Sequence, residues 1–403
     1  MFLKARYSVP AIVLGAGVNG LGVVRSLARA GVPVHLADPD MHSSGARTRY
    51  AYKLRVPAVS GDALLAALDD WARSRFAGQR PVLVLTQEQT VRTISNARAH
   101  VSEHYRLSLP PTGVLDALVT KQGFYRLALD AQACVPRTLY MRQVQDLDAL
   151  GSLQFPVVVK PASHSPAYSQ RFKKAYRVQD AESVAVLYRK IQPVEPNMVV
   201  QEWIDGSDSD IYFCLQHVAS DGSLRASFVG RKIRSWPPGV GGTASCTSAH
   251  EVADELTAAT SAFFRAVGVV GTASMEFKRD ARSGRFMMIE PTIGRTDYQE
   301  EVATLHGVNI PLAAYRDAIG VVSDLPDVAV GQRVWRNRAI DRWSAQMQGL
   351  GLSEGMPEGA RAVDAYWRWQ DPVPGWAEWS GRMANRIRRL RRAPESTGMG
   401  EKG

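Results

Sequence analysis

The sequence predicts an α/β protein that begins with a parallel sheet covered by helices on both faces. The first observation is that short apolar runs alternate with amphipathic helical segments from residue 10 to residue 109. The second is that 403 residues with 45% hydrophobic content are enough for two or three hydrophobic cores. The third is a pair of short strands near residue 280, each of which carries a glutamate among apolar neighbours.

The segment from Pro10 to Asp38 has the order strand, turn, helix and strand, which predicts a Rossmann-like unit. Its turn is a G-x-G-x-x-G motif, which favours an anion at the helix N-terminus. Asp38 ends the second strand, where an acid can hold the ribose of a dinucleotide. A dinucleotide-dependent oxidoreductase is therefore one hypothesis, and close packing of helix on strand is the other. The turn residues concerned are Gly15, Gly17, Asn19 and Gly20.

The two glutamate-bearing strands, 272–278 and 285–291, are joined by a polar turn and predict a hairpin. Glu276 and Glu290 lie inside these strands, and burial of a lone carboxylate is costly. The pattern therefore favours a divalent cation between them, and hard oxygen ligands suit Mg²⁺ or Mn²⁺. The alternative is a pair of glutamates on a face of the hairpin that contacts only solvent.

Cationic residues between Pro110-Pro111 and the hairpin suit an anionic ligand. Lys121 lies near the start of a predicted helix, where the dipole disfavours a cation that serves no anion. Lys160 ends an apolar strand and either presents its ammonium group to a phosphate or extends to solvent. Lys174 lies in a polar segment with small hydroxyl residues, which predicts a flap that cradles phosphates.

Two further segments carry polar groups next to predicted strands. After a strand ending near Glu202, an acid such as Asp208 can hold ribose hydroxyls while the backbone of 202–204 contacts a base edge. Arg231 and Lys232 precede a loop rich in proline and glycine and are expected to grip a phosphate or a substrate. A charged edge strand is the alternative for the second segment.

From about residue 110 to residue 320, the order of these features resembles the ATP-grasp superfamily. The features are a lysine before a VP turn, a K-P strand end, a basic flap, a Q-E-W-I-x-G hinge and two strands with carboxylates. The N-terminal region resembles the pre-ATP-grasp domain, whose glycine turn tends to face the acceptor substrate. The run R-K-x-R-x-x-P-P-x-x-G resembles carboxylate-amine ligases of the D-aspartate ligase type.

The resemblance implies a two-lobed α+β ATP-grasp fold after the Rossmann-like domain. The expected domains are 1–109, then 110–325 with a small mobile lobe at about 150–205, then a Trp-rich appendage with a basic tail at 326–403. The implied activity is an ATP- and magnesium-dependent ligase that forms an acyl phosphate, joins it to an amine or similar nucleophile and releases ADP and phosphate. The implied partners are a small carboxylate and an amine, without nucleic acid.

The resemblance also assigns site residues. The sequence departs from the family at Glu290-Pro291-Thr292, where the family has Glu-x-Asn. A threonine hydroxyl would then replace the amide oxygen that usually binds the metal. A catalytically silent nucleotide-binding module is therefore a further alternative. Arg295 is expected to hold the substrate carboxylate or the tetrahedral intermediate. The full assignment is Lys121, Lys160, Lys174, Glu202, Trp203, Ile204 and Asp208 for ATP; Glu276, Glu290 and Thr292 for the metal; Arg231, Lys232 and Arg295 for catalysis; and Gly15, Gly17, Asn19 and Gly20 for the substrate.

Composition adds three expectations. The three cysteines have no metal or redox spacing, and no apolar run reaches the roughly 18 residues of a membrane helix, so a cytoplasmic protein with free thiols is expected. Six tryptophans after residue 330 are expected to anchor the C-terminal segment on the enzyme. Residues 380–403 carry six Arg and one Lys against two Glu, a net +5 of the total +10, and predict either a solvated helix or weak contact with a membrane surface or a partner.

Overall fold

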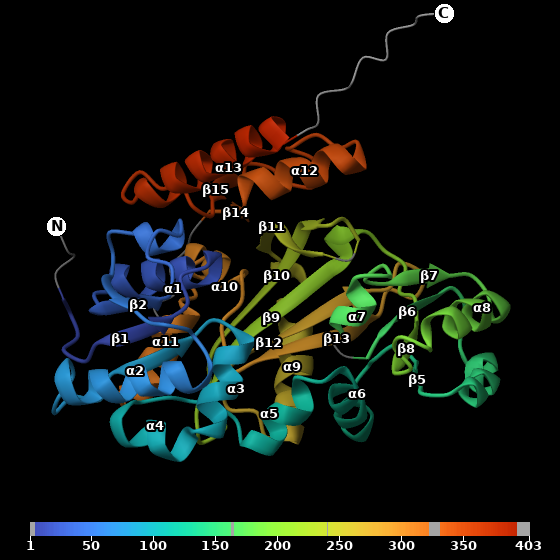
Figure 1. Cartoon of the computed structure of the whole chain (residues 1–403), viewed down its shortest axis with the longest axis horizontal. Coiled ribbons are helices and arrows are strands. Elements are labelled where there is room, and N and C mark those ends of the chain that lie inside the picture. Colours follow the sequence, from blue (N-terminus) through green and yellow to red (C-terminus); the bar gives the residue numbers. More distant parts are fainter. Residues whose placement is uncertain (1–4, 163–164, 240, 322–330, 393–403) are drawn as a thin grey trace, which may run out of the picture.

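The computed structural model describes residues 5–162, 165–239, 241–321 and 331–392, of which 385–392 are described by their backbone only. The described chain forms three β-sheets with helices between and around them (Figure 1). The predicted α/β class is therefore confirmed. No helix among these residues is long and apolar enough to cross a membrane.

The N-terminal sheet is parallel, as the alternation of strands and helices predicts. Its strand order is β3-β2-β1-β4, and β1 is buried along its whole length because helices cover both faces. The strands are β1 (Ala11–Leu14), β2 (Val34–Asp38), β3 (Tyr52–Arg55) and β4 (Val82–Leu85), and the helical segments are α1 (Val18–Arg29), η1 (Gly45–Arg47), α2 (Gly61–Ser74), α3 (Glu88–Asn96) and α4 (Arg98–His104).

The small lobe is an antiparallel sheet in the order β5-β8-β6-β7, and Val157, Val159 and Tyr188 lie in its core. Its sheet begins at Thr138, earlier than the predicted start near residue 150. Helices α5 (Thr112–Leu118) and α6 (Lys121–Asp130) precede it. Its elements are β5 (Thr138–Met141), η2 (Val144–Ser152), β6 (Val157–Pro161), α7 (Pro166–Ser169), β7 (Tyr176–Val178), α8 (Ala181–Ile191) and β8 (Met198–Glu202).

The large sheet has the order β13-β12-β9-β10-β11-β14-β15 and is covered on both faces. Cys214 packs with Phe264 of α9, whereas Phe213, next to it along the strand, packs with Val302 of α10. The strands are β9 (Ile211–Val218), β10 (Leu224–Trp236), β11 (Gly242–Ser248), β12 (Gly271–Arg279), β13 (Phe286–Ile293), β14 (Arg333–Arg336) and β15 (Arg361–Asp364). The helical segments are η3 (Asp208–Asp210), η4 (His250–Val252), α9 (Ala253–Val267), α10 (Glu300–Leu305), α11 (Ile310–Ala318), α12 (Arg338–Gln348) and α13 (Val373–Arg392).

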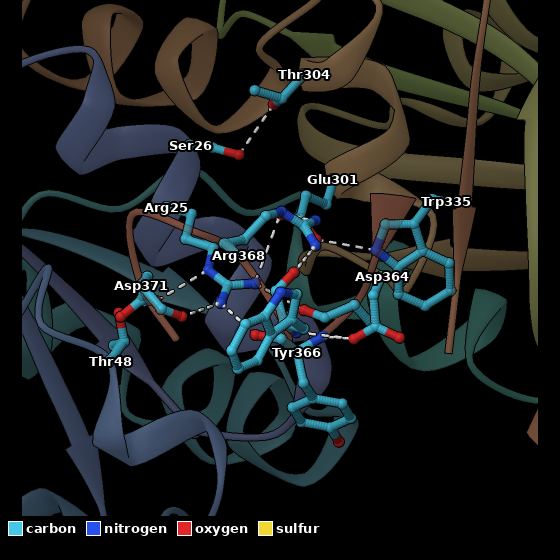
Figure 2. Close-up of polar contacts among 12 residues, drawn as sticks. Arg25, Ser26, Thr48, Glu301, Thr304, Trp335, Asp364, Tyr366, Arg368 and Asp371 are labelled. Carbon is cyan, nitrogen blue, oxygen red and sulfur yellow. Dashed lines mark hydrogen bonds and ion pairs between the residues drawn. The ribbon is translucent and has the colours of Figure 1, made fainter. Parts of the chain in front are cut away.

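The C-terminal segment is more than the appendage that the sequence predicts, because β14 pairs with β11 and extends the large sheet. Figure 2 shows how the segment also contacts the N-terminal domain: Arg25 of α1 pairs with Asp371, with Nε 3.1 Å from Oδ2. The same guanidinium donates to the carbonyl oxygens of Ala365 and Tyr366. Asp371 also accepts a hydrogen bond from Thr48 at 2.7 Å.

The tryptophans of this segment differ in burial, which corrects the expectation that all of them anchor it. Trp335 is buried and donates its indole N–H to Glu301 at 2.9 Å. Trp343, Trp369, Trp376 and Trp379 are exposed. Residues 380–392 of the basic tail form the end of α13, whereas the side chains of 385–392 and all of 393–403 lie outside the described part of the chain.

The cysteines have the free thiols that the sequence predicts. Cys214 and Cys246 are buried, and Cys134 is half-buried. Burial raises the pKa of the Cys214 and Cys246 thiols above the usual value for cysteine, so both thiols are uncharged.

Candidate functional site

A cavity of about 300 Å³ lies between the small lobe, the start of α6 and the large sheet. Its polar lining gathers side chains from many parts of the sequence. The residues among them that the sequence predicts are Lys121, Lys160, Lys174, Lys232, Glu276, Glu290, Thr292 and Arg295.

The glutamate pair lies on β12 and β13, which form the predicted hairpin. Glu276 and Glu290 face each other across the two strands as direct register partners. The Lys232 ammonium lies 2.7 Å from an oxygen of Glu276, while Glu290 forms no ion pair with any described residue. Burial raises the pKa of Glu276, and the neighbouring Lys232 acts in the opposite direction. A lysine therefore supplies part of the compensating charge that the sequence assigns to a metal ion.

The donor set fits a magnesium ion that also binds phosphate oxygens. No group of three or more His, Cys, Asp or Glu side chains that could hold a metal exists among the described residues, so the protein alone provides no complete cage. Mg²⁺ commonly binds through one or two carboxylates together with substrate phosphates and water, and Glu276 and Glu290 supply that number. The Thr292 hydroxyl points to Asp297, with Oγ1 3.4 Å from Oδ2.

The three lysines predicted to bind phosphate line one cavity. Lys121 is the first residue of α6, and Lys160 lies near the end of β6. Burial lowers the pKa of Lys160 to about 8, and the charges of Lys121 and Lys174 act in the same direction. Lys160 donates a hydrogen bond to Gln201 at 3.2 Å. This concentration of positive charge favours an anionic ligand, which would relieve the repulsion between the ammonium groups.

The arginine of the site lies on a short loop after β13. The Arg295 guanidinium lies 3.7 Å from an oxygen of Asp297 and donates to the carbonyl of Thr296. Asn19 fixes this loop from the N-terminal domain: its amide donates to the carbonyl of Thr296 at 2.8 Å and accepts from the Thr296 hydroxyl at 2.9 Å. Asn19 is buried, so the structure corrects its assignment from substrate binding to positioning of the Arg295 loop.

The glycine turn does not line the cavity. A Cβ atom on Gly20 would lie 1.9 Å from the carbonyl oxygen of Gly15, so the glycine allows close contact between turn and helix. Both oxygens of Asp38 accept backbone N–H groups, from Ala16 at 2.7 Å and Asp40 at 2.9 Å. Asp38 therefore stabilises the turn itself, and the geometry supports the packing interpretation over the dinucleotide hypothesis. Gly15 and Gly17 are likewise absent from the cavity lining.

Arg231 and Asp208 lie away from the cavity, which corrects two assignments. Arg231 pairs in register with Tyr212, whose side chain belongs to the core beneath α9, on the face of β10 opposite Lys232. Asp208 is buried and accepts the backbone N–H groups of Ser235 at 2.9 Å and Gly239 at 2.8 Å. Its carboxylate therefore holds the loop after β10 and has no oxygen directed to a ribose.

The hinge residues lie at the end of β8 but do not line the cavity. Glu202 accepts the backbone N–H of Gln154 at 2.9 Å. The Trp203 ring has Arg177 and Lys278 within cation–π distance, at 4.9 and 5.2 Å from its centroid. Ile204 is buried. Gln201, one residue earlier, does line the cavity and contacts Lys160.

Sequence reasoning missed several polar cavity residues. Asp297 adds a further carboxylate to the cavity lining, and its position two residues after Arg295 in a short polar loop was the available signal. Glu88 comes from the first turn of α3 in the N-terminal domain, so only the fold brings it to the cavity. The other missed polar residues are Thr120, Tyr125, Thr138, Tyr140, Gln201, Thr243, Ser274, Tyr298 and Gln299.

Comparison with known proteins identifies the architecture. No family model and no curated protein matches the sequence. The biotin carboxylase domain of Hydrogenobacter thermophilus 2-oxoglutarate carboxylase, solved with MgADP, ADP and bicarbonate, matches with a TM-score of 0.61 at 12% identity, over 81% of this chain and 73% of that one. Biotin carboxylase from Campylobacter jejuni matches with a TM-score of 0.61 at 13% identity, over 78% and 71% of the two chains.

A second group of matches has a similar coverage. N5-carboxyaminoimidazole synthetase from Staphylococcus aureus, complexed with ADP, matches with a TM-score of 0.62 at 12% identity, over 83% of this chain and 82% of that one. At such low sequence identity, the structural similarity shows the fold but does not identify the substrate. Both groups consist of ATP-grasp enzymes. The protein described here has the ATP-grasp fold.

Proposed function

We propose that this protein is an ATP-dependent ligase that activates a carboxylate as an acyl phosphate and joins it to an amine or similar nucleophile, with release of ADP and phosphate. One observation carries the proposal. Lys121, Lys160 and Lys174 line the same 300 Å³ cavity as the cross-strand pair Glu276 and Glu290. Solved structures of the same fold contain ADP in a biotin carboxylase domain and in N5-carboxyaminoimidazole synthetase.

The lysines suit the binding of a nucleotide triphosphate. Phosphoryl transfer depends mainly on positioning and on compensation of the charge on the phosphate oxygens. Lys160 is already partly desolvated, so its ammonium would interact with a phosphate more strongly than a lysine on an open surface. Lys174 lies on the segment between α7 and β7, which would cover the phosphates from the small lobe.

The carboxylates suit the binding of magnesium, which would neutralise phosphate charge and hold the γ-phosphoryl group for transfer. Lys232 favours the charged form of Glu276, and Glu290 has no competing ion pair among the described residues. Glu290 is therefore the carboxylate better suited to bind the metal ion. Thr292 would contribute a neutral oxygen, which is a weaker ligand than a carboxylate.

Arg295 suits the acceptor carboxylate. Its planar guanidinium can bind two carboxylate oxygens at once, and Asn19 fixes the loop that carries it. The nucleophile would attack the activated carbonyl from the same cavity, so no protein nucleophile is required. The resemblance of the segment 231–241 to ligases of the D-aspartate ligase type makes an amino acid or related amine the first nucleophile to test.

Ligand-dependent thermal unfolding separates the three candidate functions. Mg-ATP should raise the unfolding midpoint, while NAD and NADP should not, because ligands stabilise only the state they bind. Stabilisation by NAD or NADP but not by Mg-ATP would contradict the proposal. A silent nucleotide-binding module would bind Mg-ATP without releasing ADP across a panel of acids and amines.

The site assignment has its own test. Glu290→Gln should reduce ADP formation by at least about a hundredfold, a size typical of losing one charge-stabilising group in an active site. Glu182→Gln, on the exposed face of α8, is the matched control and should keep full activity. Unchanged turnover in Glu290→Gln would remove the metal assignment.

A further inference from the structure

An exposed row of aromatic rings covers the outer side of α13 and the loop before it. Trp369 is 82% exposed, and Trp376 and Trp379 are 58% and 59% exposed. The rings form a continuous series of edge-to-face contacts through Trp367, with centroid distances of 5.7 to 6.1 Å between successive members. Val373 and Met383 of α13 are exposed as well. We call these exposed residues, Trp369, Val373, Trp376, Trp379 and Met383, the Trp face.

The Trp face is one stripe of an amphipathic helix. Positions 373, 376, 379 and 383 follow helical spacing, so their side chains point to the same side of α13. The opposite side packs on the protein: Pro374 is buried, and Glu378 accepts a hydrogen bond from Ser44 at 2.9 Å. In Figure 1, α13 lies along the outer edge of the molecule beside α12. An apolar stripe of this size at an outer edge normally contacts another apolar surface.

The positive charge of the sequence next to the Trp face favours one kind of binding partner over another. The sequence from residue 382 to residue 392 contains six arginines and no acid. A second copy of the chain would bring two such segments together, and their repulsion would oppose the contact. An anionic lipid surface would be attracted by the arginines and would take up the tryptophans at the level of its headgroups.

Binding of nucleic acid would explain fewer residues of the Trp face than binding to a membrane. Single strands contact aromatic rings by stacking, but Val373 and Met383 offer no ring, and they continue the same stripe. A stripe of aliphatic and aromatic side chains on a helix whose sequence is rich in arginine is typical of helices that lie in the plane of a membrane.

We infer that α13 docks the enzyme on anionic membranes through its Trp face, with the helix parallel to the bilayer surface. The described chain has no helix that could cross the membrane, so the contact would be peripheral. The cavity lies between the small lobe and the large sheet and shares no residue with the Trp face. Docking is therefore independent of the proposed ligase reaction.

Vesicle flotation of the full chain tests this inference. Vesicles of equal parts phosphatidylcholine and phosphatidylglycerol should bind the protein at about 0.1 M salt, and binding should weaken at about 1 M salt or with phosphatidylcholine alone. The variant Trp369→Ser/Trp376→Ser/Trp379→Ser should lose at least about tenfold in partition coefficient. Its unfolding midpoint should match the wild type, because the replaced rings are exposed. If the triple variant does not fold, Trp369→Ser alone should still reduce partitioning.

A control variant removes three exposed apolar side chains elsewhere on the protein. Leu129→Ser/Val186→Ser/Leu224→Ser changes three exposed side chains outside α12 and α13 and should bind vesicles like the wild type. Equal vesicle binding by the wild type and the folded tryptophan variant would overturn the inference. A wild-type dimer in solution that the tryptophan variant loses would assign the face to a second copy. Oligonucleotide binding without vesicle binding would assign it to nucleic acid, and each result rejects membrane docking.

Discussion

Replacing Asp371 by asparagine tests whether the C-terminal segment is structurally joined to the N-terminal domain. The carboxylate is fully buried and accepts hydrogen bonds from Arg25 and Thr48 at 3.1 and 2.7 Å (Figure 2). It also accepts the backbone N–H of Arg49 at 3.0 Å. The asparagine is nearly the same size but is neutral, and its amide group would face donors. The Arg25 guanidinium would stay buried with one charged partner fewer.

The expected loss can be worked out from these contacts. Removing one partner of a buried ion pair costs about 3–5 kcal/mol, because the other charge is left uncompensated. Arg25 keeps its bonds to two carbonyl oxygens, and one guanidinium nitrogen lies 3.9 Å from Glu301, so we expect the lower end, about 3 kcal/mol. The double variant Arg25→Met/Asp371→Leu should lose less than either single variant, because it leaves no buried charge of that pair.

Urea unfolding of the purified protein measures this loss, followed by far-UV circular dichroism. Asp205→Asn is the matched control: its carboxylate pairs with Arg177 and Arg282 at 3.4 and 3.3 Å, but it is partly exposed. Exposed pairs contribute about 0–1 kcal/mol. Equal losses in Asp371→Asn and Asp205→Asn would refute the reasoning, since burial would then make no difference.

Three further predictions concern titratable groups. Because the pKa of Lys160 is lowered to about 8, its ammonium group loses its proton as the pH rises through 8. Mg-ATP affinity, measured by calorimetry, should therefore fall by up to about tenfold per pH unit above pH 8. The variant Lys160→Met should not show this pH dependence. Lys232→Met should raise the magnesium concentration needed for ADP formation, because Glu276 loses the cation that favours its charged form; an unchanged magnesium requirement would contradict this. Burial raises the pKa of Glu300 from 4.5 to about 8, so its stabilising contribution is complete below pH 4.5 and is lost as the pH rises through 8. Glu300→Gln should therefore match the wild type in unfolding free energy at pH 5 and exceed it by on the order of 4 kcal/mol at pH 9, whereas an equal difference at both pH values would argue against the shift.

The fold was predictable where each element has its own periodicity. The parallel N-terminal sheet and the hairpin β12–β13 follow from short apolar runs and turn residues. The attachment of β14 to β11 was not predictable, because four residues such as Arg333–Arg336 carry no signal for their partner strand. The Arg25–Asp371 pair likewise joins residues that are 346 positions apart in the sequence.

The site was predictable where a charged residue lies in an apolar strand, because its burial is costly unless it binds a partner. Glu276, Glu290 and Lys160 are charged residues in apolar strands, and all three line the cavity. Asp208 was misassigned because an acid next to a turn binds backbone N–H groups as readily as a ligand. Arg231 was misassigned because the alternation of a strand separates its two faces but does not reveal which face meets the cavity.

The charges around the cavity explain why the proposed nucleotide would need a metal ion. The lining contains five cationic residues, Lys121, Lys160, Lys174, Lys232 and Arg295, and four carboxylates, Glu88, Glu276, Glu290 and Asp297. The protein charges therefore nearly cancel. A nucleotide triphosphate brings several negative charges that this lining leaves mostly uncompensated. A divalent ion between the phosphates and Glu290 would restore the balance, whereas a site for the phosphates alone would need fewer acids. The two strand carboxylates are thus better explained by a metal–nucleotide complex than by either component bound separately.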